Sequence, residues 1–227
     1  MSNILIIQTC DGVVYKPLLD LSQEINNKYA IKHGYGYFRY DGVKKPFNKD
    51  PSLSTFNRIY LLLDTLNEDK YEWVLYLDAD AIVYDINKNL DEFIIHKNKA
   101  IVACRGGTDN PANFWDINIG VCLYNLKHPK MPYILENWKN MFEFYGKNIS
   151  NTVDNWEKSQ QKLDDQNMLH IILKKDNTLC HVYYGEENEK MNYNGPFIKQ
   201  LIRGNKTTFE SRLNDMKNLC NIINRKF

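Results

Sequence analysis

The sequence predicts an α/β sandwich in which helices cover both faces of a mostly parallel central sheet. Two observations lead to this prediction. Short apolar runs alternate with segments of helical periodicity through the first half of the chain, in the order β-α-β-α-β-α-β, a pattern typical of parallel strands joined by crossover helices. The run WVLYLDADAIVYD (73–85) is also almost continuously apolar. Such a run is typical of a central strand that is covered on both faces.

The first elements follow from local pattern. NILIIQT (3–9) is a short apolar run that predicts the first strand, and apolar residues at helical spacing predict a helix over 17–32. Gly34 is placed to end that helix, because glycine readily adopts the left-handed conformation of a helix C-terminus. The second strand is then expected from Tyr35 to Tyr40.

The central strand is expected between two helices. A polar loop with Gly42 and two prolines occupies 42–51. An apolar stripe predicts a helix over 52–69, with a serine or threonine as its N-terminal cap. The strand is expected over 71–85, and NLDEFIIH (89–96) predicts a short helix.

The second half of the chain is less regular. Apolar runs predict further strands, and periodic runs predict helices whose ends are marked by acidic or polar residues. The expected order is a strand at 100–105, a loop at 106–114, a strand at 115–125, helices at 131–146 and 164–175, a strand at 178–185, a mixed segment at 192–204 and an amphipathic helix at 208–227.

Bulk properties exclude several classes of function. The 227 residues suit one domain (1–227), and the formal net charge of +1 gives no field for nucleic acid or anionic lipid. The five cysteines are scattered and form no CxxC pair, which favours reduced thiols in a cytoplasmic protein over a disulfide framework. No segment approaches the roughly 20 apolar residues of a transmembrane helix. We therefore expect a cytoplasmic protein, located in the host cytoplasm if the source is viral.

Asp78 and Asp80 stand out within the apolar run 73–85. A buried carboxylate needs a partner or gives up its charge. Residues i and i+2 of a strand share a face, so the two side chains converge if the strand continues. At the carboxyl end of a parallel strand they can hold a divalent cation, which in turn can hold a diphosphate. We therefore expect their charge partner to come from outside the chain.

Three other interpretations of the Asp-x-Asp pattern remain open. The two residues can be strand-end caps or turn residues without further function. An aspartyl phosphatase of the haloacid dehalogenase type also begins with such a pattern, but on its first strand, whereas about 70 residues precede it here. A nucleotidyltransferase needs a glycine-rich, arginine-bearing loop after the first strand, and QTCDG (8–12) is no such loop.

Several separated segments carry a family resemblance. They are NKYAIKHGYGY (27–37), the segment 57–85 that ends in the Asp-x-Asp pattern, NIGVCLYN (118–125), a Trp-bearing helix and DDQNMLHIIL (164–173). In this order they resemble metal-dependent GT-A glycosyltransferases. They are most similar to the retaining galactosyl-, mannosyl- and xylosyltransferases of fungi and plants and to related viral and bacterial enzymes. The resemblance spans roughly residues 25–203, and the ordered set is more specific than any single segment.

The resemblance implies the GT-A fold, a three-layer α/β/α sandwich, and a metal-dependent hexosyl- or pentosyltransferase. The donor would be a nucleoside diphosphate sugar such as a UDP- or GDP-sugar. The acceptor would be a hydroxyl of a glycan or glycoprotein, and the anomeric configuration would be retained. An inverting transferase, a phosphohydrolase with Asp78 as nucleophile and an inactive nucleotide-sugar or glycan-binding module remain alternatives.

The resemblance also suggests a metal site for Mn²⁺ or Mg²⁺. Asp80 would be a direct ligand, and Asp78 would contact the donor ribose or a metal-bound water. The family usually adds a late histidine, and this chain has Gln200 at that position. An amide oxygen is a weaker ligand for Mn²⁺ than imidazole, so the third ligand is a point of departure. His181 is an alternative candidate.

The remaining site residues are inferred from the resemblance and from their positions along the chain. Asp165 and Gln166 would face the donor sugar or the reacting centre, and Asp164 or Asp165 would be the base of an inverting enzyme. Asp164, Asp165 and Gln166 also begin a helix, so capping by itself accounts for at least one of the acids. The expected donor contacts are Thr9, Arg58, Asp78, Asn118, Gly120, Lys199 and Arg203.

Overall fold

The computed structural model describes residues 3–44, 51–107, 109–149, 164–184, 191–192, 195–204 and 207–226. Its central layer is a six-stranded sheet with the strand order β2-β1-β3-β6-β5-β7. The strands are β1 (Ile4–Cys10), β2 (Gly36–Asp41), β3 (Trp73–Asp78), β5 (Ile101–Arg105), β6 (Ile117–Asn125) and β7 (Cys180–Tyr183).

The expected mostly parallel sheet is confirmed. Strand β1 lies parallel to β2 and to β3, and β7 lies parallel to β5. Of the six strands that the structure describes in this sheet, only β6 runs in the opposite direction, between β3 and β5. The carboxyl ends of β1, β2 and β3 therefore meet at one edge of the sheet, where α/β proteins form ligand crevices.

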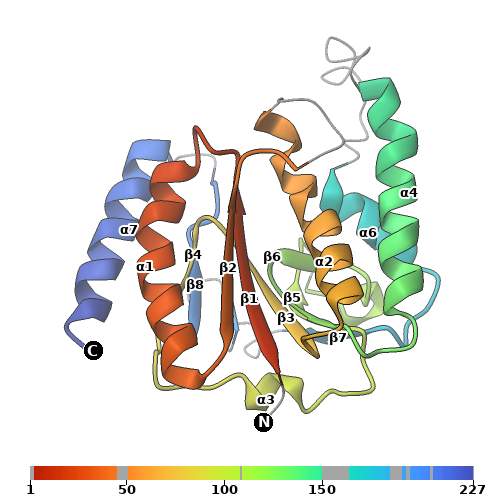
Figure 1. The fold of residues 1–227 in the computed structure, drawn as a ribbon, viewed down its shortest axis with the longest axis horizontal. Helices are drawn as coiled ribbons and strands as arrows, with labels where there is room; N and C mark the ends of the chain where they lie inside the picture. The colour runs from red at the N-terminus through yellow and green to blue at the C-terminus, as the bar shows by residue number, and fades with distance from the viewer. Residues whose placement is uncertain are drawn as a thin grey trace.

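Helices cover both faces of the sheet, as Figure 1 shows. Helices α1 (Lys16–His33) and α7 (Phe209–Asn224) lie side by side on one face. The short α3 (Asp91–Ile94) lies near the end of the sheet where β1 begins. The other face is covered by α2 (Asn57–Glu68), α4 (Met131–Ile149) and α6 (Asp165–Leu173). Alternate residues of β1 enter the two cores, Ile4 and Ile6 on one side and Leu5 and Ile7 on the other. This alternation follows from the period of two along a strand.

The expected strand over 71–85 is wrong as a single element. Strand β3 ends at Asp78, residues 79–80 form a turn, and β4 (Ala81–Val83) starts a second, two-stranded sheet. Its partner is β8 (Ile198–Gln200), which runs antiparallel to it with Ala81 opposite Gln200. The apolar pattern indicated burial correctly, because both strands are buried. Burial alone does not reveal a change of sheet.

The predicted helix ends have mixed outcomes. Gly34 ends α1 with a φ of 70°, as expected. The cap expected for the helix over 52–69 is wrong, because a 3₁₀ turn over Pro51–Phe56 leads into α2 and Phe56 occupies the N-cap without a side-chain hydrogen bond. Among the described residues, no helix is long and apolar enough to cross a bilayer.

Candidate active site

A cavity of about 560 Å³ opens at the edge of the sheet where β1 and β3 end. Its wall combines the end of β1, the loop before α1, the turn between β3 and β4, the segment that includes β8, and the first turns of α7. The lining residues that matter below are Thr9, Tyr15, Asp78, Asp80, Gln200 and Arg212. Segments far apart in sequence thus meet at one site.

Asp78 and Asp80 converge on Gln200. The Gln200 Nε2 atom donates to Asp78 Oδ2 at 3.2 Å and to Asp80 Oδ1 at 3.3 Å. The pairing of β4 with β8 places Gln200 there, and the Leu201 amide adds a bond to the Asp80 carbonyl at 3.0 Å. The expected convergence is present, but it comes from a turn and a second sheet and not from a continuing strand.

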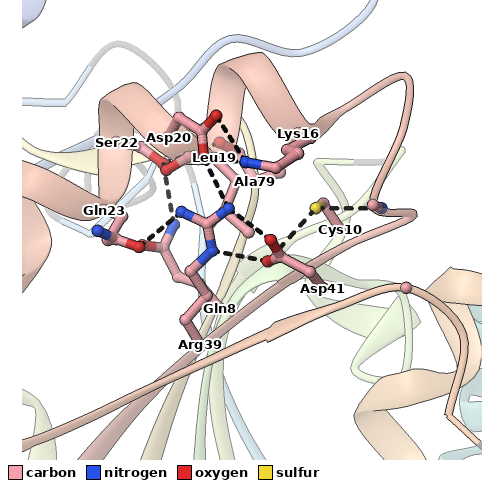
Figure 2. A network of polar contacts seen from close by, with 12 residues as sticks. Gln8, Cys10, Lys16, Leu19, Asp20, Ser22, Gln23, Arg39, Asp41 and Ala79 are labelled. Atoms are coloured by element: carbon pink, nitrogen blue, oxygen red, sulfur yellow. Dashed lines mark hydrogen bonds and ion pairs between the residues drawn. The ribbon is translucent and has the colours of Figure 1, made fainter.

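A buried polar cluster of Gln8, Ser22 and Asn26 supports the turn from below. Gln8 Nε2 lies within hydrogen-bond distance of the carbonyl oxygens of Asp78 and Ala81, at 3.2 and 3.3 Å. Ser22 donates to the Ala79 carbonyl at 3.0 Å, as Figure 2 shows. Asn26 donates to the Ala81 carbonyl and accepts from the Val83 amide. These bonds satisfy the backbone groups that the break between β3 and β4 leaves without strand partners.

A second polar network fastens β2 to α1 beside the cavity. Figure 2 shows the Arg39 guanidinium reaching Asp20, Gln23 and Asp41. Asp41 lies 3.9 Å from the thiol of Cys10, and that thiol accepts from the Gly12 amide. The arginine lowers the pKa of both carboxylates through hydrogen bonds and charge, with Lys16 the first contributor at Asp20. Ionised groups therefore tie α1 to strand β2 next to the loop that borders the cavity.

Arg58 joins two parts of the site. It is buried on α2, and its guanidinium donates to Asp78 Oδ1 at 2.8 Å and to Asp165 Oδ2 at 3.0 Å. The guanidinium also lies 4.3 Å from the ring centre of Tyr76, whose hydroxyl is 2.6 Å from that of Thr9. Arg58 therefore sits beneath the cavity wall, where it compensates the charge of two carboxylates.

Arg212 is the charge partner of Asp80, as Arg58 is of Asp78. It lies in the first turn of α7, is buried, and pairs through Nη2 with Asp80 Oδ2. Its Nε atom donates to the Leu201 carbonyl at 2.7 Å, and Nη1 lies 3.5 Å from the Tyr15 hydroxyl. That hydroxyl also accepts from Arg203. The expectation that the aspartates need a partner from outside the chain is corrected here, because Arg58 and Arg212 are partners within it.

The cluster still carries excess negative charge. Three carboxylates, those of Asp78, Asp80 and Asp165, share the guanidinium groups of Arg58 and Arg212. Burial, and then the charge of Asp78, raises the pKa of Asp80 to about 7, although Arg212 opposes the shift. Burial likewise raises the pKa of Asp165 to about 7 against the influence of Arg58. A further cation would stabilise the ionised forms.

The donor set at the turn fits a hard divalent cation. Asp78 Oδ2 and Asp80 Oδ1 point to the same spot, and carboxylate oxygens are ligands that Mg²⁺ and Mn²⁺ prefer. Gln200 turns Nε2 to this spot, and its amide oxygen accepts from Asn192 Nδ2 at 3.1 Å, so the amide would have to turn over to serve as a ligand. The set is smaller than in many metal centres. Among the residues that the structure describes, no group of three or more His, Cys, Asp or Glu side chains is placed to hold a metal.

Gly120 of β6 passes directly beside these groups. A Cβ atom at this position would lie 2.1 Å from Gln200 Nε2 and 2.6 Å from Asp78 Oδ2. Asn118 accepts from the Gly120 amide at 2.8 Å, and Gln166 accepts from the Ile119 amide at 3.3 Å. The N-x-G segment and the start of α6 therefore adjoin the two aspartates, and the glycine leaves the room that they occupy.

Other predicted residues lie farther from the cavity wall. Lys199 lies with Nζ 4.6 Å from the ring centre of Tyr84, on the opposite side of β8 from Gln200. Asp164 is the N-cap of α6 and accepts from the Asn167 amide at 2.7 Å, so the expected capping role is confirmed. His181 stacks on His96 with ring centres 3.5 Å apart, away from the two aspartates.

Sequence reasoning missed Arg212 and the polar cluster of Gln8, Ser22 and Asn26. A signal for Arg212 exists in the last helix, where the buried positions are Arg212, Met216, Cys220 and Ile223. An arginine on an otherwise apolar stripe requires a buried partner. The stripe does not say which carboxylate that partner is, so only the tertiary structure links it to Asp80.

The fold and one stretch of the sequence have known counterparts. The model of the galactosyl transferase GMA12/MNN10 family matches residues 2–105. No curated protein sequence matches the chain. The match covers β1 to β5, including the turn with Asp78 and Asp80.

Several solved structures resemble the whole chain. A glycosyltransferase involved in the glycosylation of the major capsid of PBCV-1 is 14% identical, with a TM-score of 0.66 over 95% of this chain and 99% of that one. The galactosyltransferase LgtC, solved with donor and acceptor sugar analogues, is also 14% identical, with a TM-score of 0.55 over 96% of both chains. The bifunctional glycosyltransferase WbbM is 10% identical, with a TM-score of 0.54 over 96% of this chain and 50% of that one. At such identities the likeness concerns the fold, and it confirms the predicted GT-A sandwich.

Proposed function

We propose that this chain, which has the GT-A fold, is a glycosyltransferase that moves a sugar from a nucleoside diphosphate sugar to an acceptor hydroxyl with retention of configuration. The proposed donor is a UDP- or GDP-sugar, and the proposed acceptor is a glycan or glycoprotein. The observation that carries the proposal is the convergence of Asp78, Asp80 and Gln200 at the wall of a cavity large enough for a nucleotide sugar. This cavity lies at the carboxyl ends of parallel strands, where the fold binds its ligands.

The proposed cofactor is Mn²⁺ or Mg²⁺, held by Asp78, Asp80 and Gln200. When bound, such an ion supplies Lewis-acid stabilisation of the diphosphate that departs. Arg58 supports this role because it holds Asp78 in place and shares charge between Asp78 and Asp165. The Gln8, Ser22 and Asn26 cluster supports it by fixing the backbone of the turn.

Retention is favoured by the surroundings of the candidate bases. An inverting transferase needs a carboxylate within hydrogen-bond distance of the acceptor hydroxyl. Asp165 is buried and engaged by Arg58, and Asp164 caps α6. Neither is among the residues that line the cavity. In a retaining reaction of this fold, the leaving diphosphate can guide the acceptor onto the same face of the sugar without a strong base.

The proposal is tested with a panel of UDP- and GDP-sugars in Mn²⁺. The full chain is incubated with each donor, nucleoside diphosphate release is measured with and without glycan acceptors, and the anomeric configuration of any product is determined by NMR. We expect release from one donor class, acceptor-dependent stimulation and a retained configuration.

Substitutions locate the reaction at the cavity. Asp80→Asn should reduce turnover at least about 100-fold, because it removes a charged ligand from the transition-state site. Asp215→Asn on α7 removes an exposed carboxylate outside the cavity and serves as the matched control. Release of inorganic phosphate from simple monoesters without sugar transfer would favour a phosphohydrolase. Donor binding without any turnover would favour an inactive nucleotide-sugar-binding module.

A further inference from the structure

We propose that Asn192 is a positioning residue that opposes metal binding, because it holds the Gln200 amide with its NH₂ group towards Asp78 and Asp80. This role rests on the function proposed above, since it concerns the cation that the two aspartates and Gln200 would hold. The Gln200 side chain then has two working orientations. Its nitrogen bridges the aspartates without metal, and its oxygen faces the cation once metal is bound.

The Gln200 Nε2 atom stands between the two carboxylates. It lies 3.2 Å from Asp78 Oδ2 and 3.3 Å from Asp80 Oδ1. An amide NH₂ group has two donors, one for each of these oxygens, and an ionised carboxylate can only accept. The two aspartates therefore select this orientation in the absence of metal. The same orientation cannot ligate a cation, because the NH₂ group turns donors and not an oxygen towards it.

Asn192 selects the same orientation from the other end of the amide. Its side chain is fully buried, and its Nδ2 atom donates to Gln200 Oε1 at 3.1 Å. The Asn192 carbonyl accepts from the Gly195 amide at 3.1 Å, which ties the residue to the segment before β8. If the Gln200 amide turned over, one NH₂ group would face another unless Asn192 turned as well. Ligation of a metal by Gln200 therefore breaks the bond from Asn192.

The site lets the amide turn while the backbone stays in place. Gln200 pairs with Ala81 in the small sheet, and the next amide bonds to the Asp80 carbonyl at 3.0 Å. On another side, a Cβ atom at Gly120 would lie 2.1 Å from Nε2. A turn about the last side-chain bond of Gln200 exchanges two groups of similar size about a soft torsion. The bond from Asn192 thus biases a local equilibrium between two amide orientations.

The test measures metal affinity without donor or turnover. Mn²⁺ binding to the full chain is followed by electron paramagnetic resonance in Asn192→Leu, which removes the donor and keeps a branched side chain. We expect binding to tighten about three- to tenfold, because the Gln200 oxygen no longer gives up a hydrogen bond when it turns to the cation. A merely structural role predicts the opposite sign, since loss of a buried partner would loosen the site.

Two further variants assign the effect to the Gln200 amide. The gain from Asn192→Leu should shrink to within about twofold when Gln200→Met removes the amide that Asn192 holds. Asn125→Leu is the matched control and should leave Mn²⁺ affinity unchanged. Asn125 is also buried, but its amide bonds to the carbonyl oxygens of Lys97 and Lys99, outside the cavity.

A measurement on the unmodified chain remains informative if Asn192→Leu does not fold. The side-chain NH₂ signals of Gln200, identified by their absence in Gln200→Met, are followed by NMR during a titration with diamagnetic Mg²⁺. We expect slow hydrogen exchange of this NH₂ group without metal, and a change in its chemical shifts and exchange rate as Mg²⁺ binds. Signals that stay unmoved at saturating Mg²⁺ would show that the amide does not turn.

The outcomes separate this role from the proposed transferase. Unchanged or weaker Mn²⁺ binding in folded Asn192→Leu, or a full gain that persists with Gln200→Met, would overturn the inference and leave the transferase intact. If no donor of the panel is turned over while Asn192→Leu still tightens Mn²⁺ binding, the transferase is refuted and the role of Asn192 stands. Absence of Mn²⁺ and Mg²⁺ binding to the unmodified chain would contradict this role and the proposed cofactor together.

Discussion

At Gly120, strand β6 passes so close to Asp78 and Gln200 that no side chain fits between them without movement. The sequence suggested this glycine through its place in an N-x-G segment, and the structure gives a steric reason for it. Its backbone amide donates to Asn118 Oδ1 within the same strand, and the pairing of β6 with β3 limits how far β6 can shift away.

We expect Gly120→Ala to reduce sugar transfer at least about tenfold, with a small cost in stability. The new methyl group would displace the flexible amide of Gln200 and the carboxylate of Asp78, and misplaced groups at a reacting centre cost rate steeply. Transfer kinetics and urea unfolding check the two parts of the prediction. Gly204→Ala is the matched control, since its Cβ would meet only ordinary contacts at 3.7 Å. Unchanged kinetics would mean that the site has more room than the structure gives it.

His170 is buried on α6, with Nε2 located 2.9 Å from the Ile117 carbonyl and 3.2 Å from its amide nitrogen. Burial lowers the pKa of its imidazole, although the Ile117 backbone and nearby acids oppose the shift. The folded chain therefore keeps this histidine neutral at a pH where the unfolded chain protonates it.

The pH dependence of stability follows from this difference. Below the ordinary histidine pKa of about 6.5 the unfolded chain binds more protons at this position, so the free energy of unfolding should fall as the pH falls. His170→Gln should flatten this slope between about pH 5 and 7, as measured by urea unfolding at several pH values. An unchanged slope in the variant would assign the dependence to other groups.

At the scale of elements, the break between β3 and β4 is stabilised by side chains of β1 and α1. Asn26 bonds to Gln8, to the Ala81 carbonyl and to the Val83 amide, so one side chain of α1 satisfies two backbone groups of β4 and a side chain of β1. The turn that carries Asp80 therefore depends on the packing of α1 for its geometry.

We expect Asn26→Ala to lower the free energy of unfolding by about 2–3 kcal/mol, because it leaves buried polar groups of β4 and Gln8 without partners. Transfer and Mn²⁺ affinity should fall as well, since the turn loses its support. Asn27→Ala on the exposed side of the same helix is the control for helix propensity. Urea unfolding and metal titration measure the two effects, and a loss no larger than that of the control would refute the supporting role.

Helix α7 is the second element that decides the site. It begins with a reciprocal capping box between Thr208 and Ser211, which fixes its first turn directly before Arg212. Such a box satisfies free amide groups at a helix start. The position of the Arg212 guanidinium on Asp80 thus follows from a local sequence signal together with the packing of α7 on α1.

At the scale of the whole molecule, the cavity is closed by segments from both ends of the chain. The pairs Arg58–Asp165 and Asp80–Arg212 join residues 107 and 132 positions apart. Ligand binding at one wall of the cavity is therefore expected to stabilise the distant segment that forms another wall.

Hydrogen exchange tests this connection. UDP or GDP, whichever binds, should slow amide exchange in residues 209–216 of α7 and in the turn at 78–81, and should leave α4 unchanged. Helix α4 lies on the opposite face of the sheet and serves as the internal control. Protection confined to the loop after β1 would show that α7 does not take part in nucleotide binding.

Much of the architecture could be predicted from the sequence, because alternation of apolar runs and helical stripes depends on local spacing. The strands near 3–9, 35–40 and 100–105 and the helix near 17–32 agree with β1, β2, β5 and α1. The mostly parallel sheet followed from their order. The single strand over 71–85 failed, since burial on both sides of a turn gives the same apolar pattern as one long strand.

The candidate site, like the fold, could be predicted only in part from the sequence. Asp78, Asp80, Gly120 and Gln200 could be named from motif and order along the chain, because the spacing of short motifs is a local property. Their charge partners could not be named. The aspartates were expected to depend on a cation from outside, whereas the folded chain brings Arg58 and Arg212 to them across long stretches of sequence. The sequence by itself indicated the candidate residues of the site, and the tertiary structure decided which charges face each other, because only packing fixes distances between residues that are far apart in the chain.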